Sequence, residues 1–140
     1  MSDVVAIARA WIGTPYLHQA SCRGAGCDCL GLVRGIWREL RGAEPVAIPP
    51  YSRQWDEISP REILWHAAAT YLSPAKAEWS TGDVLLFRMR EGAPAKHLGI
   101  LSRQDQFIHA YEGHGVVESP LGTAWRRRVV ARFRFHGGAD

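Results

Sequence analysis

Hydrophobic residues near the start of the chain recur at the three- and four-residue spacing of helices. The first such stretch predicts a helix over roughly residues 4–12, with Ser2-Asp3 as its cap and Gly13 at its end. The second predicts a helix over about 28–40, whose apolar stripe is wide enough for a central, buried position. A helix in that position would hold the residues of its first turn rigidly.

A third helix is predicted after a proline-bounded connection. Pro45, Pro49 and Pro50 keep the connection extended, because proline fixes its own backbone and donates no hydrogen bond. Ser59-Pro60-Arg61-Glu62 then supplies a cap serine, a first-turn proline and a capping-box glutamate before an apolar stretch that ends at Tyr71.

The pattern changes to strands after Ser73-Pro74. Turn signals such as Thr81-Gly82-Asp83 separate the strands, and the connections are too short for parallel crossovers. Five strands are predicted, at 84–88, 97–102, 106–111, 115–118 and 129–135. Helices followed by an antiparallel sheet of about five strands indicate an α+β domain.

The length of 140 residues and a hydrophobic content of 46% suit one core, so we expect a single domain over residues 1–140. The first residues lack a basic leader followed by an apolar stretch, and no window reaches eighteen apolar residues. We therefore expect synthesis in the cytoplasm without a signal peptide, and no insertion into a membrane.

The formal net charge of +3 would suit an anionic partner, but the excess is modest. Its dense cluster is Arg126-Arg127-Arg128, and a run of this length is more often a solvated edge than a nucleic-acid site. No nucleic-acid partner is expected.

Three cysteines, Cys22, Cys27 and Cys29, lie in one loop, and their odd number does not suit a disulfide scaffold. Cys29 opens the predicted central helix, where the helix dipole favours a thiolate. His97 begins a predicted strand and could serve as an imidazolium beside the thiol and later as the proton donor to a leaving amine.

His109 lies twelve residues beyond His97. A hairpin that turns at 103–105 would place the two histidines roughly opposite each other, where His109 could orient the ring of His97. Asp28 precedes the thiol, and its carboxylate would oppose a thiolate unless it points away or caps the helix. We predict that it points away.

Five motifs in order along the chain resemble those of the NlpC-type cell-wall peptidases of the papain-like superfamily. They are Gly13-Thr14-Pro15-Tyr16, Gly26-Cys27-Asp28-Cys29-Leu30-Gly31-Leu32, Thr81-Gly82-Asp83-Val84-Leu85-Leu86-Phe87, His97-Leu98-Gly99-Ile100 and Phe107-Ile108-His109-Ala110. The resemblance implies a papain-like NlpC fold, in which the nucleophile begins a central helix packed on the C-terminal sheet.

By this resemblance Cys29 is the nucleophile, His97 the general base and acid, His109 the orienting residue and Tyr16 a supporting hydroxyl. The implied reaction cleaves murein stem peptides, commonly between D-γ-glutamate and a diamino acid, through a thioester, with no metal or organic cofactor. Asp28 is implied to help hold the amino end of the stem, whereas Leu30 replaces the serine that is usual there.

The segment Gly13 to Ser21 and the compact length resemble the phage-tail branch of the family, including gene transfer agent tails. This implies tail or baseplate proteins as partners, a place in a phage-like tail particle, and action in the periplasm or cell wall of a recipient cell.

Three alternatives stay open. A structural module could hold zinc with the three cysteines and one histidine, although the spacing of Cys22, Cys27 and Cys29 differs from that of zinc knuckles. A tail adaptor could retain the peptidase fold without turnover. An acyltransferase or amidase could use the same scaffold on a different bond.

Overall fold

The computed structural model describes residues 3–44 and 62–135. Its helices are α1 (Asp3–Ala10), α2 (Cys29–Arg41), α4 (Ile63–Tyr71) and the short α5 (Thr123–Arg127). Its strands are β1 (Ser21–Cys22), β2 (Gly26–Cys27), β3 (Ser73–Pro74), β4 (Val84–Phe87), β5 (His97–Arg103), β6 (Gln106–Tyr111), β7 (Gly115–Pro120) and β8 (Val129–Arg134). The predicted α+β class is confirmed.

The prediction of an antiparallel sheet is also confirmed. Six strands pair in the order β3-β8-β4-β5-β6-β7, and all their pairings are antiparallel. Five of them are the predicted strands, with ends shifted by no more than two residues, and β3 is an additional strand of two residues. The proline-bounded connection and the Ser59 cap lie outside the described residues.

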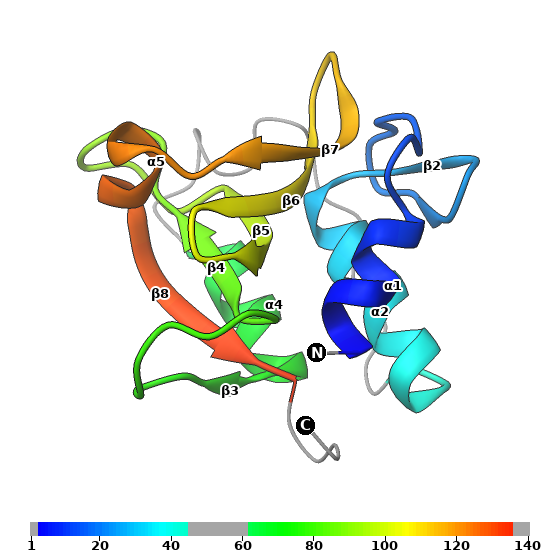
Figure 1. Ribbon diagram of the computed structural model, residues 1–140, viewed down its shortest axis with the longest axis horizontal. Coiled ribbons are helices and arrows are strands. Elements are labelled where there is room, and N and C mark those ends of the chain that lie inside the picture. Colours follow the sequence, from blue (N-terminus) through cyan, green and yellow to red (C-terminus); the bar gives the residue numbers. More distant parts are fainter. Residues whose placement is uncertain (1–2, 45–61, 136–140) are drawn as a thin grey trace.

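Two helices from the start of the chain pack side by side at one end of the sheet (Figure 1). Their close approach depends on Gly35 of α2, because a Cβ there would lie 2.1 Å from Cζ2 of Trp11. The Trp11 indole N–H also donates to the Glu39 carboxylate at 2.8 Å. The ring therefore fixes how the segment after α1 meets α2.

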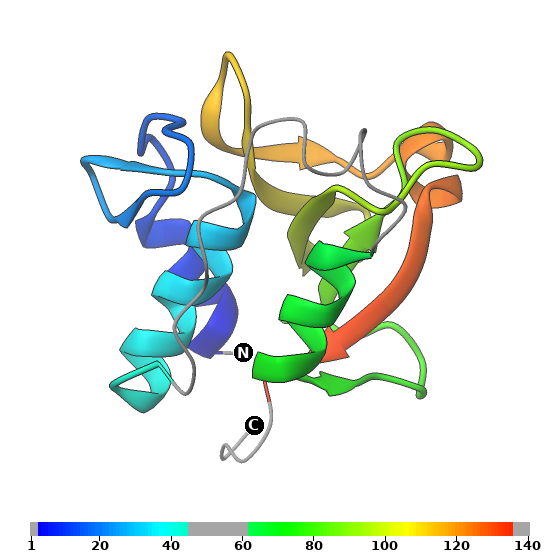
Figure 2. The same cartoon turned by 180° about the vertical axis from the view of Figure 1, so that it is seen from behind.

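Figure 2, the view from behind, shows α4 in front of the sheet, and the last residue of α4, Tyr71, contacts Trp37 of α2. The Trp37 indole meets the Tyr71 ring edge-on, with centroids 5.8 Å apart, and donates to the Tyr71 carbonyl. Arg34 and Arg38 of α2 bind Glu44, which also accepts from the Tyr71 hydroxyl. These contacts hold α2 between the first helix and the third.

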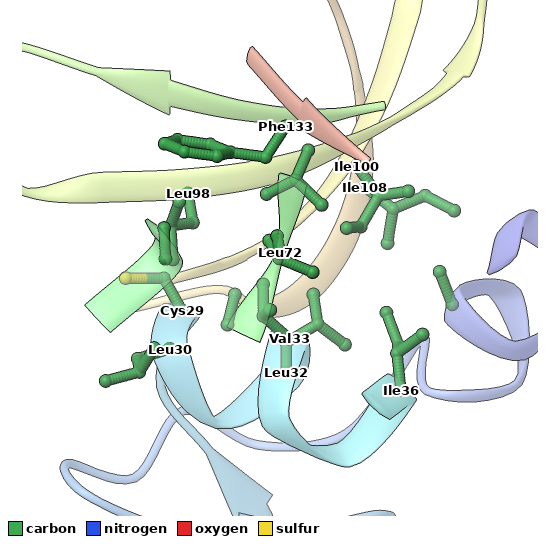
Figure 3. Close-up of a cluster of buried hydrophobic side chains, with 14 of the residues drawn as sticks. Cys29, Leu30, Leu32, Val33, Ile36, Leu72, Leu98, Ile100, Ile108 and Phe133 are labelled. Carbon is green, nitrogen blue, oxygen red and sulfur yellow. The ribbon is translucent and has the colours of Figure 1, made fainter. Parts of the chain in front are cut away.

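The first half of α2 lies on one face of the sheet. Leu32, Val33 and Ile36 are fully buried there and face Leu98, Ile100 and Ile108 of β5 and β6 (Figure 3). Figure 3 also places Cys29 in the first turn of α2, beside this cluster. The central position predicted for this helix is confirmed.

The other face of the sheet carries a second, smaller cluster. It contains Leu85, Phe87, Leu101 and Phe107, and Trp125 of α5 packs against it. No helix in the described segments is long and apolar enough to cross a membrane.

Candidate active site

The segment before α2 is fixed by backbone pairing. Cys27 donates its N–H to the Pro15 carbonyl, and its own carbonyl accepts from Leu17 N–H, both at 3.0 Å. Tyr16 forms an isolated parallel bridge with Cys27, and its ring packs partly buried against the core. Tyr16 therefore lies beside Cys27, two residues before Cys29 in the chain.

Asp28 is the N-cap of α2. Its Oδ1 accepts from Gly31 N–H and its Oδ2 accepts from Gln19 N–H, both at 2.7 Å. Asp28 is 3% exposed, and its Oδ2 also lies 3.9 Å from Nδ1 of His18. The carboxylate thus caps the helix, the other of the two arrangements considered for it, and its burial leaves little of Asp28 accessible to a substrate.

Gly31 allows the preceding loop to approach the first turn of α2. A Cβ at this position would lie 1.9 Å from the carbonyl oxygen of Ala20. The adjacent Leu30, in the place of the family's usual serine, is 3% exposed and belongs to the core. The two residues that follow the thiol in the helix thus serve packing.

Cys29 lies where α2 and the start of β5 meet. Its Sγ is 3.9 Å from the carbonyl oxygen of Lys96, the residue bonded to His97. Cys29 and His97 are each 8% exposed, so neither is sealed from solvent. The fold therefore brings the predicted nucleophile to the peptide bond that precedes the predicted base.

His97 and His109 are directly joined. Nε2 of His97 lies 2.7 Å from Nδ1 of His109, and the rings meet edge to face. The register Ile100↔Ile108 makes them diagonal neighbours and not opposite ones, which corrects the predicted alignment. Gly99 lies beside His109, and a Cβ there would be 2.7 Å from Cδ2 of Phe107.

Both rings are neutral at pH 7. Burial lowers the pKa of His97 to about 3, with further lowering by the positive charges of His109 and Lys96. Burial and the charge of His114 lower the pKa of His109 to about 4. A neutral His97 suits a general base, and it does not suit the imidazolium predicted to stabilise a thiolate.

Two residues that contact the histidines were not predicted from the sequence. Ser119 Oγ lies 2.9 Å from Nε2 of His109. The Trp125 ring lies 5.6 Å from His97 and 5.4 Å from His109, measured between centroids. Ser119 and Trp125 lie after the strand predicted over 115–118. Ser119 reaches the site because β7 extends to Pro120, and Trp125 reaches it because of the position of α5.

The cysteines do not form the zinc site of the structural alternative. Cys22 is exposed, whereas Cys27 and Cys29 are buried, and burial and the charge of Asp28 raise the pKa of Cys27 to about 12. Over residues 3–44 and 62–135, no three His, Cys, Asp or Glu side chains are grouped so that they could hold a metal ion.

The sequence and the fold are similar to those of known proteins. Residues 13–134 match the model of the NlpC/P60 family. "Probable endopeptidase NlpC" of Escherichia coli K12 is 30% identical over 84% of this chain and 66% of its own length. "Murein DD-endopeptidase MepS/Murein LD-carboxypeptidase" of the same organism is 29% identical over 84% of this chain and 54% of its own length.

A more distant relative is the "Gamma-DL-glutamyl hydrolase" of Bacillus subtilis, 26% identical over 94% of this chain and 29% of its own length. Among solved structures, the NlpC/p60 domain of the peptidoglycan hydrolase SagA superposes with a TM-score of 0.58 at 21% identity, covering 93% of this chain and 94% of that domain. The chain spans about two thirds or less of the curated relatives' length. It belongs to the NlpC/P60 family.

Proposed function

We propose that the protein is a cysteine hydrolase that cleaves peptide bonds in the stem peptides of peptidoglycan. The observation that carries the proposal is the meeting of Cys29 with the start of β5, where a neutral His97 is hydrogen-bonded to His109. The names of two relatives, a murein endopeptidase and a γ-DL-glutamyl hydrolase, support the class of substrate.

The free ring nitrogen decides which atom of His97 acts. Because Nε2 is bonded to His109, Nδ1 is the atom that serves the thiol. Nδ1 takes the Sγ proton as the sulfur attacks the carbonyl carbon, and the backbone N–H of Cys29 at the positive end of α2 stabilises the oxyanion. Nδ1 then protonates the leaving amine, which leaves a thioester on Cys29.

Water completes the reaction. His97 Nδ1 accepts a proton from the attacking water, and the thioester carbonyl becomes a carboxylic acid. Collapse of the second tetrahedral intermediate returns the proton to Sγ. The thiol and the neutral imidazole are both regenerated, so no metal or organic cofactor is needed.

For the scissile bond we propose the one between D-γ-glutamate and the following diamino acid. Support comes from the motif resemblance and from the name of the Bacillus subtilis relative. The buried cap role of Asp28 and the burial of Leu30 argue that the amino end of the stem is recognised by other groups in this protein.

We further propose that the enzyme works in a phage-like tail, docked on tail or baseplate proteins, and digests the recipient's wall during delivery of DNA. The support is the resemblance of the segment from Gly13 to Ser21 to that branch of the family. Mass spectrometry of purified tail particles tests this setting, since the proposal requires the protein to be a stoichiometric component of them.

Digestion of purified murein by wild type and Cys29→Ala tests the function. Wild type should release stem fragments whose masses identify the cleaved bond, and Cys29→Ala should release none. Cys22→Ala is the matched control, because it removes an exposed thiol from the same loop and should keep full activity. Equal release by wild type and Cys29→Ala would leave the non-catalytic adaptor as the function.

A further inference from the structure

The strand β7 presents two adjacent side chains to opposite faces of the sheet, as successive residues of a strand do. Glu118 binds Arg9 of α1 at 3.2 Å and accepts from the Ser102 hydroxyl at 2.6 Å. Ser119 instead contacts His109, with Oγ 2.9 Å from Nε2. His109 pairs with Val117 in the register of the two strands, so Ser119 reaches its ring diagonally.

His109 therefore has a partner on each ring nitrogen. Nδ1 lies 2.7 Å from His97 Nε2, and Nε2 lies 2.9 Å from Ser119 Oγ. The ring is 1% exposed, so solvent cannot replace either partner. A neutral imidazole carries one N–H, and its two partners together decide which nitrogen holds it.

Only two proton arrangements satisfy the contact between the two histidines. In the first, His97 Nε2–H donates to His109 Nδ1, and His109 Nε2–H donates to Ser119 Oγ. In the second, Ser119 Oγ–H donates to His109 Nε2, and His109 Nδ1–H donates to His97, whose own proton then lies on Nδ1. The second arrangement leaves His97 with no lone pair for the thiol, so it has no general base.

The reaction itself demands the first arrangement. When His97 takes the thiol proton, both of its nitrogens are protonated, and His109 Nδ1 must accept from Nε2. His109 Nε2–H must then find an acceptor, and the described contact of that atom is Ser119 Oγ. The acceptor is needed most when positive charge develops on His97.

We propose that Ser119 is a positioning residue that holds the proton of His109 on Nε2 and so leaves Nδ1 of His97 as the base. The inference rests on the proposed function for its catalytic consequence. Ser119 touches neither substrate nor thiol in this role, because it acts through His109. In the described part of the chain, three charged or titratable groups lie near the two rings. Lys96 lowers the pKa of His97, His114 lowers that of His109, and the Tyr111 ring stacks on His109 with centroids 5.2 Å apart.

Variants at this position separate the role from simple packing. Ser119→Ala removes the acceptor and should lower kcat by about tenfold with little change in KM, the effect of one lost hydrogen bond. Ser119→Thr keeps a hydroxyl and should restore most of the rate. Ser102→Ala removes a serine hydroxyl from the other face of the sheet, and should leave kcat unchanged.

A carboxylate gives the decisive signature. Ser119→Asp offers an acceptor with negative charge, which stabilises the imidazolium of His97 through His109 and raises its pKa. The acid limb of kcat/KM for a γ-D-glutamyl-diaminopimelate stem peptide should therefore move to higher pH, by about one unit. An unchanged limb, together with an unchanged kcat in Ser119→Ala, would overturn the proposal.

Nitrogen-15 NMR of the ring nitrogens tests the proton positions without any assay of turnover. The wild-type His109 should be protonated on Nε2 and bare on Nδ1, and Ser119→Ala should populate the other tautomer. A wild-type proton on Nδ1 of His109 would overturn the proposal. If Cys29→Ala digests murein as well as wild type, the proposed function fails, whereas the NMR result still decides the role of Ser119.

Discussion

At the scale of single residues, the two histidines link the site to the stability of the fold. Their pKa values, about 3 and about 4, are below the ordinary value of 6.5, because burial disfavours the charged rings. As the pH falls below 6.5, these histidines therefore bind protons in the unfolded chain before they do so in the folded protein. The free energy of unfolding should be level above about pH 7.5 and fall as the pH drops below about 6.5.

The slope should approach about 1.4 kcal/mol per pH unit for each ring between pH 5 and 6. Burial raises the pKa of Glu44, but hydrogen bonds from Arg34, Tyr71 and Arg38 lower it to about 2. Protonation of Glu44 therefore affects the free energy of unfolding mainly below this pH window. Urea unfolding across the window measures the slope. His109→Gln should reduce it, and His66→Gln, at an exposed position, should not.

Asp28 gives a second prediction at this scale. Asp28→Ala leaves the N–H groups of Gly31 and Gln19 without their acceptor, and should lower the free energy of unfolding by about 2 kcal/mol. Asp28→Asn keeps one acceptor for Gly31, so its loss should be smaller. Asp3→Asn changes an exposed carboxylate in the first turn of α1 and should stay within about 0.5 kcal/mol of wild type. Equal losses at Asp28 and Asp3 would contradict the cap.

At the scale of elements, the position of α2 depends on glycines that admit neighbouring groups. A Cβ on Gly35 would overlap Trp11, and one on Gly31 would overlap the Ala20 carbonyl. Gly35→Ala should therefore lower the free energy of unfolding by about 1 to 3 kcal/mol, in spite of the better helix propensity of alanine.

The urea midpoint measures this loss, and Gly122→Ala is the control. Gly122 has an ordinary φ of −77° and no atom within 4 Å of the Cβ position. Its substitution should change stability only by the small cost of replacing a helix-capping glycine. A Gly35→Ala variant as stable as Gly122→Ala would mean that the two packed segments can separate without cost.

The elements were largely predictable, and the reasons lie in local patterns. The helical spacing of the hydrophobic residues and the capping residues predict the ends of α2 to within one residue, because Asp28 and Gly42 mark the two ends of the helix. The strand predicted over 115–118 ends two residues before the observed end of β7 at Pro120, although proline usually ends pairing, and the prediction therefore misses Ser119. β3 and α5 are too short to carry a periodic signal, so the position of Trp125 could not be foreseen.

At the scale of the whole molecule, the site joins two parts of the chain that are far apart in sequence. Cys29 begins α2 and both histidines lie on strands of the sheet (Figure 1), so the approach of the thiol to the start of β5 is a tertiary feature. The order of the motifs could suggest this meeting. The register of β5 with β6, which makes the histidines diagonal, could not be derived without the turn geometry.

The charge of the whole molecule is unevenly spread, and this leads to the last prediction. Arg126, Arg127 and Arg128 are exposed, and within the described part of the chain no carboxylate forms an ion pair with them. Arg126 also lines a cavity of about 410 Å³ and lies over the Trp79 ring. Murein carries carboxylates, so this edge should strengthen binding to the intact wall at low salt.

Replacing all three arginines by glutamine should weaken pelleting with insoluble murein by about threefold at low ionic strength, and the difference should vanish as salt screens the charges. The kcat on a soluble stem peptide should stay unchanged, because these side chains do not contact the two histidines or the thiol. The matched control removes the same charge from dispersed positions, by Arg23→Gln, Lys76→Gln and Arg90→Gln. If both triple variants lose binding to murein equally, the net charge of the protein determines that binding, and the three arginines at this edge have no special role.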